Sequence, residues 1–111
     1  MKTALVTGGA KRIGAEIVRA LAEDGWRVLV HYNTSASEAE DLAGSLTASG
    51  SVVQTIGCDL ANLEATLNLI QECNKLVGPL DCLINNASLF EPDWLTSVEP
   101  ALWQRQLDVN L

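Results

Sequence analysis

The fold is decided by one stretch of the sequence, Thr7-Gly8-Gly9-Ala10-Lys11-Arg12-Ile13-Gly14. It follows a short apolar run at residues 4–6 and leads into residues 15–21. Apolar side chains recur every four residues at Ile13, Ile17 and Leu21, which predicts one face of a helix. The expected order is therefore strand, glycine loop and helix. Gly8 and Gly9 let the chain turn sharply, and the unpaired N–H groups that begin a helix suit an anion such as phosphate.

Three further apolar runs predict strands, and helical patterns separate them. The runs cover residues 26–32, 52–58 and 80–84. The first of these is apolar at consecutive positions in its middle, as expected for a parallel strand that is covered on both faces. Strands that alternate with helices predict βαβ units with right-handed crossovers. The predicted fold class is α/β, a Rossmann-like, doubly wound parallel sheet with strand order 3-2-1-4 and flanking helices.

The third helix is expected to span residues 63–77. Asn62 is its predicted N-cap, and Gly78-Pro79 is expected to end it because neither residue continues a helix well. Its apolar residues keep a helical spacing: Leu63, Leu67, Ile70 and Val77.

Composition limits the class of partner. The chain has 111 residues, of which 48% are hydrophobic, so it forms one compact domain at most. Its net charge of −7 opposes a polyanion, and we expect no nucleic-acid partner. Lys11 and Arg12 nevertheless place two positive charges side by side in the glycine loop. They favour a small phosphorylated ligand there, and the alternative interpretation is two solvated loop charges.

The remaining residue types predict location and exclude some chemistry. Residues 1–3 lead directly into a strand, without a secretory signal or a membrane-spanning stretch, so a cytoplasmic protein with no membrane partner is expected. Cys58, Cys73 and Cys82 lack a C-x-x-C spacing and are expected to be reduced and mostly buried, without a metal. His31, the only histidine, is interpreted as a packed or hydrogen-bonded side chain rather than a catalyst.

The tip after the second strand bears on the choice of cofactor. In a Rossmann-like sheet an acid at this place holds the ribose 2′-hydroxyl of NAD. Here the tip is Asn33-Thr34-Ser35, and no carboxylate comes before Glu38. NADP is therefore favoured over NAD. A structural role is also open, because Ser35 or Ser37 could form a capping box with Glu38 or Glu40, three residues later, for a helix that runs to about residue 46.

The glycine loop resembles the T-G-x-x-x-G-[IL]-G fingerprint of the short-chain dehydrogenase/reductase family. Arg12 stands where most of that family has its middle glycine, and Lys-Arg-Ile-Gly is similar to the pteridine reductase branch. In that branch the arginine is thought to reach the cofactor phosphates and the substrate side. The resemblance implies that the loop binds the cofactor through Gly8, Lys11, Arg12, Ile13 and Gly14.

The same resemblance implies cofactor contacts in two further segments. Residues 31–35 resemble a pteridine reductase segment that has an arginine at the position of Thr34, so Asn33, Thr34 and Ser35 are left as contacts at the tip. The family also places Asp-Leu beside the adenine, which implies a role for Asp59 and Leu60. The alternative for Asp59 is that it only starts the following turn.

The end of the fourth strand carries the second motif, Asn85-Asn86-Ala87-Ser88. Asparagine amides both donate and accept hydrogen bonds, which suits groups that hold neighbouring strands and a ribose. The family usually has Asn-Asn-Ala-Gly, and Ser88 followed by Leu89-Phe90 again resembles the pteridine reductases. The resemblance implies cofactor contacts by Asn86, Ala87 and Ser88. It also implies a substrate site formed by Arg12, Ser88 and Phe90, unless Phe90 is a hydrophobic anchor of its loop.

The last residues are expected to form a loop at 91–100 and a helix at 101–111. Asn110 matches a family asparagine that supports catalysis by holding a proton-relay water, although it could equally face solvent. Family members usually pair through this helix, which implies a homo-oligomer. The family's catalytic tyrosine, with a lysine four residues later, has no counterpart, because Tyr32 is followed at that distance by Ala36.

Residues 1–111 are therefore interpreted as the N-terminal, dinucleotide-binding half of one family domain, truncated and inactive by itself. The resemblance implies an NADPH-dependent oxidoreductase that reduces a C=N bond of a pterin or dihydropteridine. Two alternatives remain open. One is a carbonyl or 3-ketoacyl reductase of the same family, and the other is a non-catalytic NADP-binding module.

Overall fold

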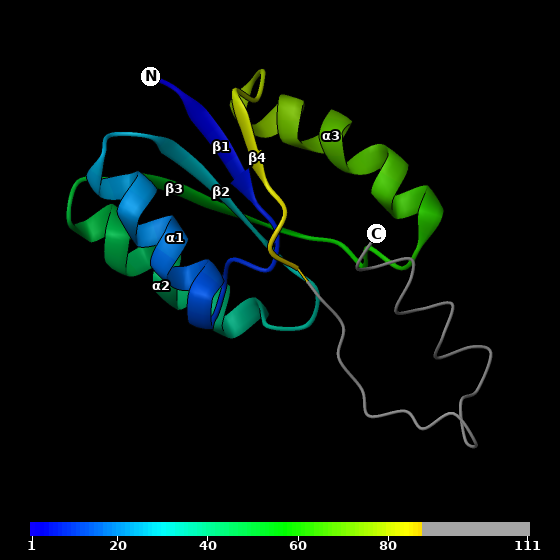
Figure 1. Cartoon of the computed structure of the whole chain (residues 1–111), viewed down its shortest axis with the longest axis horizontal. Helices are drawn as coiled ribbons and strands as arrows, with labels where there is room; N and C mark the ends of the chain where they lie inside the picture. Colours follow the sequence, from blue (N-terminus) through cyan, green and yellow to red (C-terminus); the bar gives the residue numbers. More distant parts are fainter. Residues whose placement is uncertain (88–111) are drawn as a thin grey trace.

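The computed structural model describes residues 1–87, and it confirms the predicted α/β sheet (Figure 1). All strand pairs are parallel, and the sheet order is β3-β2-β1-β4. This strand order is one that right-handed crossovers between parallel strands allow. The elements, in chain order, are β1 (Thr3–Val6), α1 (Arg12–Glu23), β2 (Arg27–Tyr32), α2 (Ala36–Ala48), β3 (Val52–Gly57), α3 (Leu63–Val77) and β4 (Cys82–Ile84).

Helices cover both faces of the sheet (Figure 1). On one face, Val6, Val28 and Val30 pack in a core with buried residues of α1 and α2. On the other face, Leu5 and Leu29 pack against buried residues of α3. Because neighbouring strand residues point to opposite faces, the two central strands are apolar at consecutive positions.

The helix that the apolar repeat predicts is present as α1, but that repeat does not form its buried face. Ile13 is 71% exposed, and Ile17 and Leu21 lie only at the margin of the core. The helix instead buries smaller residues, which keep the same periodicity one position later: Gly14, Ala15, Val18 and Ala22. Small side chains let α1 approach the sheet closely, so the larger residues cannot occupy the contact face.

The predicted span of α3 is confirmed, but its spaced apolar residues do not form its buried face. Leu63 and Leu67 are 72% and 69% exposed, and Ile70 is exposed as well. The buried residues are Leu69, Cys73 and Val77, and of these only Val77 belongs to that spacing. The helix carries apolar residues on two faces, and periodicity alone cannot tell which face meets the sheet.

The two predicted caps had different outcomes. Asn62 is the N-cap of α3, and its Oδ1 accepts a hydrogen bond of 3.0 Å from the Ala65 N–H, as expected. Ser35 is the N-cap residue of α2, but its side chain makes no cap hydrogen bond. Glu38 instead forms an ion pair with Lys11, its Oε1 lying 3.6 Å from Nζ. The predicted capping box is therefore absent from α2.

Two further findings concern the cysteines and the helices. Cys58, Cys73 and Cys82 are all free thiols, and Cys73 is buried while the other two are partly buried. Within residues 1–87, none of the helices has both the length and the apolar character needed to cross a membrane.

Candidate cofactor site

The glycine loop between β1 and α1 packs tightly against the end of β4. Gly8 has a φ of +61°, and a Cβ added there would lie 2.9 Å from the Ala87 Cα. A Cβ at Gly14 would clash with the Gly8 carbonyl oxygen and would lie 2.6 Å from the Asn86 Nδ2. Glycine is therefore required at both places, which leaves the backbone of the loop accessible from the open side.

Thr7 and Asn86 fasten the loop to the end of β4. The Thr7 hydroxyl oxygen accepts hydrogen bonds from the N–H groups of Asn86, at 2.9 Å, and Ala87, at 3.0 Å. The Asn86 side-chain amide donates in turn to the Gly8 carbonyl, at 3.1 Å. The two sequence motifs thus form one hydrogen-bonded unit at the carboxyl edge of the sheet, where ligands of open α/β sheets bind.

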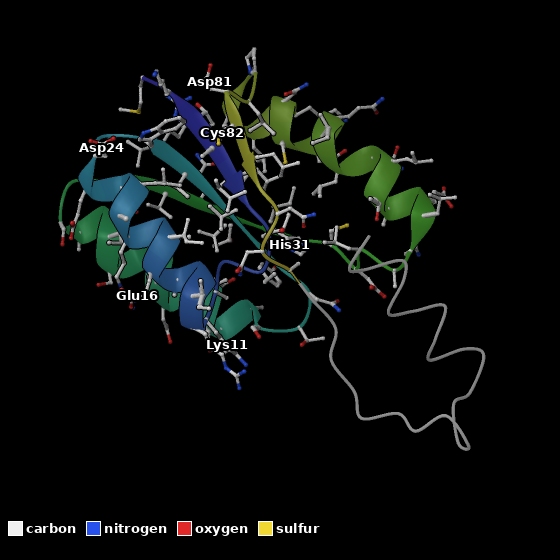
Figure 2. The ribbon with its side chains drawn as sticks, viewed as in Figure 1. Lys11, Glu16, Asp24, His31, Asp81 and Cys82 are labelled. Carbon is white, nitrogen blue, oxygen red and sulfur yellow. The ribbon has the colours of Figure 1, made fainter. Side chains whose placement is uncertain are left out.

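His31 holds the same loop from the side of β2. Only 1% of its surface is exposed, and its Nδ1 accepts the Gly8 N–H at 3.0 Å. Its Nε2 lies 2.7 Å from the Cys58 carbonyl oxygen, and burial lowers the pKa of the ring. Its own carbonyl accepts the Gly9 N–H at 3.0 Å. The expectation of a packed, hydrogen-bonded histidine is confirmed, and Figure 2 shows it near the point where the strands end.

The N–H groups that could face an anion lie later in the loop than expected. Gly8 and Gly9 donate their N–H groups to His31, so these are not free. Arg12, Ile13 and Gly14 begin α1, and the first N–H groups of a helix have no partner within it. The positive end of the helix dipole lies at the same place. An anion site is therefore expected at the start of α1.

Arg12 has an unusual backbone conformation, with a φ of +55°. This is the left-handed region, which costs a non-glycine residue roughly 1 kcal/mol. It explains why the family usually has glycine at this position. A strained arginine beside a predicted anion site points to a role for its side chain.

A cavity of about 450 Å³ opens beside the loop. Most of the predicted cofactor residues line it, from the glycine loop, the tip after β2 and the end of β4: Gly8, Lys11, Arg12, Ile13, Asn33, Ser35, Asn86 and Ala87. Ala10 and Tyr32 also line the cavity, and neither was predicted as a site residue. Tyr32 is the last residue of β2, so its place at the sheet edge was available as a signal.

The charge around the cavity is positive. Lys11 and Arg12 line it, and none of the lining residues that belong to residues 1–87 is acidic. Glu38 pairs with Lys11, and both side chains remain about half exposed. Figure 2 shows Lys11 at the beginning of α1. The cavity therefore suits an anionic ligand.

Other predicted site residues lie elsewhere. Thr34 is exposed and does not line the cavity. Asp59 accepts a 3.0 Å hydrogen bond from the Ala61 N–H with its Oδ1, which fits the alternative of a turn-starting residue. Leu60 packs against the core beneath α3. The cofactor contacts of these three stay predictions, and Ser88, Phe90 and Asn110 lie outside the described residues.

Comparisons with known proteins agree with this geometry. A family model described as short chain dehydrogenase matches residues 2–111. The chain is 34% identical to the 3-oxoacyl-[acyl-carrier-protein] reductase FabG of Staphylococcus aureus, over 99% of this chain and 45% of that protein.

Two solved structures have a closely similar fold. FolM alternative dihydrofolate reductase 1 from Brucella canis, complexed with NADP, has a TM-score of 0.91 at 38% identity, over 99% of this chain and 44% of that one. A short chain dehydrogenase from Burkholderia cenocepacia, also in complex with NADP, has a TM-score of 0.93 at 35% identity, over 99% of this chain and 45% of that one. The chain spans less than half the length of the curated relatives that it matches.

Proposed function

The chain belongs to the short chain dehydrogenase family, and we propose that it carries the NADP site of an oxidoreductase. The observation that carries this proposal is the cavity at the carboxyl edge of the sheet. It is lined by Lys11 and Arg12 and, within the described part of the chain, by no acidic residue, so it suits the extra phosphate that distinguishes NADP from NAD. The NADP complexes of the Brucella and Burkholderia relatives support the same cofactor.

The residues of this chain fit such a cofactor at two places. The close contact of Gly8 with Ala87, and of Gly14 with Gly8 and Asn86, leaves bare backbone at the start of α1, where a pyrophosphate would bind the free N–H groups. Asn33, Ser35 and Lys11 lie around the same cavity and would hold the 2′-phosphate. When bound, NADPH supplies the hydride, and this chain orients it.

For the substrate, we propose a pterin or dihydropteridine whose C=N bond is reduced. Arg12 supports this proposal, because it lines the cavity in a conformation that glycine would adopt more easily. Ser88 and Phe90 are the other proposed substrate contacts, and an aromatic ring stacks favourably on a flat heteroaromatic ring. The relation to an alternative dihydrofolate reductase, at 38% identity, also favours this substrate class.

A 3-ketoacyl reductase is the second candidate, favoured by the 34% identity to the Staphylococcus aureus reductase. The variant Arg12→Gly separates the two candidates. Because glycine adopts a φ of +55° without strain, the variant should fold at least as well as the native protein. Any loss of activity then reports the side chain itself.

The test measures NADPH oxidation by the purified full-length protein that contains this chain, with a dihydropteridine and with a 3-ketoacyl thioester. We expect turnover of the dihydropteridine and a loss of about tenfold or more in kcat/KM for Arg12→Gly, as for a lost charged hydrogen bond. Lys75→Gln, which removes an exposed charge on α3, is the matched control and should change nothing. Turnover of the thioester alone, unchanged in Arg12→Gly, would support the second candidate instead.

A further inference from the structure

His31 contacts the glycine loop through both its side chain and its backbone. The ring accepts the Gly8 N–H at 3.0 Å, and the His31 carbonyl accepts the Gly9 N–H at the same distance. On its other side the ring lies 2.7 Å from the Cys58 carbonyl oxygen. One side chain thus connects three segments: the loop after β1, the end of β2 and the residues after β3.

Only one arrangement of protons satisfies these contacts. A backbone N–H can only donate, so Nδ1 must accept from Gly8 and carries no proton. A carbonyl oxygen can only accept, so Nε2 must donate to Cys58 and carries the proton. The ring is therefore neutral, in the Nε2–H tautomer. A second proton on Nδ1 would point at the Gly8 N–H and break that hydrogen bond.

The Gly8 peptide is central to the cavity. Gly8 is in the left-handed conformation, and its carbonyl accepts from the Asn86 side-chain amide at 3.1 Å. The same carbonyl oxygen is the atom nearest to a Cβ built on Gly14, at the start of α1. The His31 ring holds the peptide plane that carries the Gly8 N–H, and the His31 carbonyl holds the next plane, which carries the Gly9 N–H and the Gly8 carbonyl. Holding both planes fixes the carbonyl that contacts Asn86. Gly8 and Asn86 both line the cavity.

We propose that His31 is a positioning residue of the cofactor site, which holds the glycine loop in its binding conformation through the Gly8 N–H. This inference rests on the proposed function, because what His31 positions is the NADP cavity. His31 does not itself line that cavity, so it acts through Gly8 rather than by touching the cofactor.

Two substitutions separate the hydrogen bond to Gly8 from the one to Cys58. In His31→Asn the amide oxygen is bonded to Cγ, as Nδ1 is, and can accept the Gly8 N–H. In His31→Gln the amide lies one bond further along, as Nε2 does, and can donate to the Cys58 carbonyl. His31→Leu removes both hydrogen bonds and keeps a buried apolar side chain. Val28→Ala, at a fully buried position earlier in the same strand, controls for a general loss of packing.

The first measurement is the dissociation constant of NADPH for the purified variants, below their melting temperatures. We expect His31→Leu and His31→Gln to bind about tenfold or more weakly, since a buried donor is left unpaired. We expect His31→Asn to stay within about threefold of the native protein, and Val28→Ala to bind normally. Normal binding by a folded His31→Leu, or rescue by Gln but not Asn, would overturn the proposal.

The second measurement does not depend on the cofactor. In a protein labelled with ¹⁵N-histidine, the ring signal that disappears in His31→Asn belongs to His31, and its shifts and couplings give the tautomer. We expect an unprotonated Nδ1 and a Gly8 amide protected from hydrogen exchange. A proton on Nδ1, or a fast-exchanging Gly8 amide, would overturn the proposal even if every variant failed to fold. If these signals are as expected but the native protein does not bind NADPH, the proposed function fails while the His31–Gly8 contact stands.

Discussion

Among the glycines of residues 1–87, Gly14 is the one at which an added side chain would clash most severely. A methyl group there would meet the Gly8 carbonyl and the Asn86 amide, which are held by hydrogen bonds and cannot move aside cheaply. We predict that Gly14→Ala lowers the free energy of unfolding by about 1–3 kcal/mol, the usual cost of overpacking. Urea unfolding measures this change.

Gly44 is the matched control for this prediction. It lies within α2, and nothing comes within 4 Å of a Cβ added there. Gly44→Ala should therefore raise the free energy of unfolding by roughly 0.5–1 kcal/mol, because alanine is the better helix former. Equal effects at the two positions would show that the packing around Gly14 is looser than described.

Glu38 is predicted to weaken the binding of NADPH. Its carboxylate pairs with Lys11, whose charge would otherwise be free for the 2′-phosphate. Glu38→Gln should strengthen NADPH binding about twofold to threefold at low salt and leave NADH binding unchanged, since exposed ion pairs have small effects. Glu72→Gln, which breaks the pair with Lys75 on α3, is the control. A Glu38→Gln variant that binds both cofactors equally better would contradict the assignment of Lys11.

At single positions, the sequence predicted the residues that belong to motifs. It did not predict side-chain contacts made with the backbone of distant residues. Gly8, Gly14 and Asn86 lie where their motifs place them. The contacts of His31 were not predictable, because Gly8 and Cys58 engage it with a backbone N–H and a backbone carbonyl, which every residue type except proline provides.

Among the helices, the cap of α3 makes a specific prediction. The Asn62 side chain accepts the Ala65 N–H, which otherwise has no partner within the helix. Asn62→Ala should lower the free energy of unfolding by about 1 kcal/mol. Asn68→Ala, at an exposed position within the same helix, should leave stability unchanged or slightly higher, because alanine favours helix. Urea unfolding of both variants tests this, and an equal loss in the two would rule out the cap as the cause.

The strand order was predictable, whereas the buried face of α3 was not. Repeated βαβ units with right-handed crossovers leave few arrangements of four parallel strands, and the order β3-β2-β1-β4 is one of them. In α3, by contrast, Leu67 and Leu69 belong to different faces that are equally apolar in sequence. Which face meets the sheet depends on contacts with Leu5 and Leu29, which are distant in the chain.

The α2 cap also depended on tertiary contacts. Ser35 and Glu38 have the spacing of a capping box, but Ser35 has a φ of −92° and a ψ of 47°, outside the extended conformation typical of an N-cap. Glu38 instead forms an ion pair with Lys11 in the glycine loop, which is distant from α2 in the sequence. Local spacing therefore identified the start of α2 but not the hydrogen bonds made there.

For the molecule as a whole, His31 predicts how stability depends on pH. Burial lowers the pKa of the folded ring below the unfolded value of about 6.5. As the pH falls below about 6.5, the unfolded chain takes up a proton before the folded protein does. His31 should therefore contribute full stability above about pH 6.5, and this contribution should be lost as the pH falls from there toward the lowered pKa of the folded ring.

Unfolding of the native protein and of His31→Asn in urea, between about pH 7.5 and 5, measures this contribution. Burial raises the pKa of the Cys58 and Cys73 thiols, which therefore stay uncharged over the range. The native protein should lose more stability than the variant, and identical pH profiles would show that His31 titrates normally.

If this chain carries an NADP site, its relative affinity for the two nicotinamide cofactors should show it. The measurement is the dissociation constant of the purified protein for NADPH and for NADH, by fluorescence titration at one salt concentration. Because Lys11 and Arg12 line a cavity to which the first 87 residues contribute no acidic side chain, NADPH should bind at least about tenfold more tightly than NADH. Equal or tighter binding of NADH, or binding of neither cofactor, would contradict the claim.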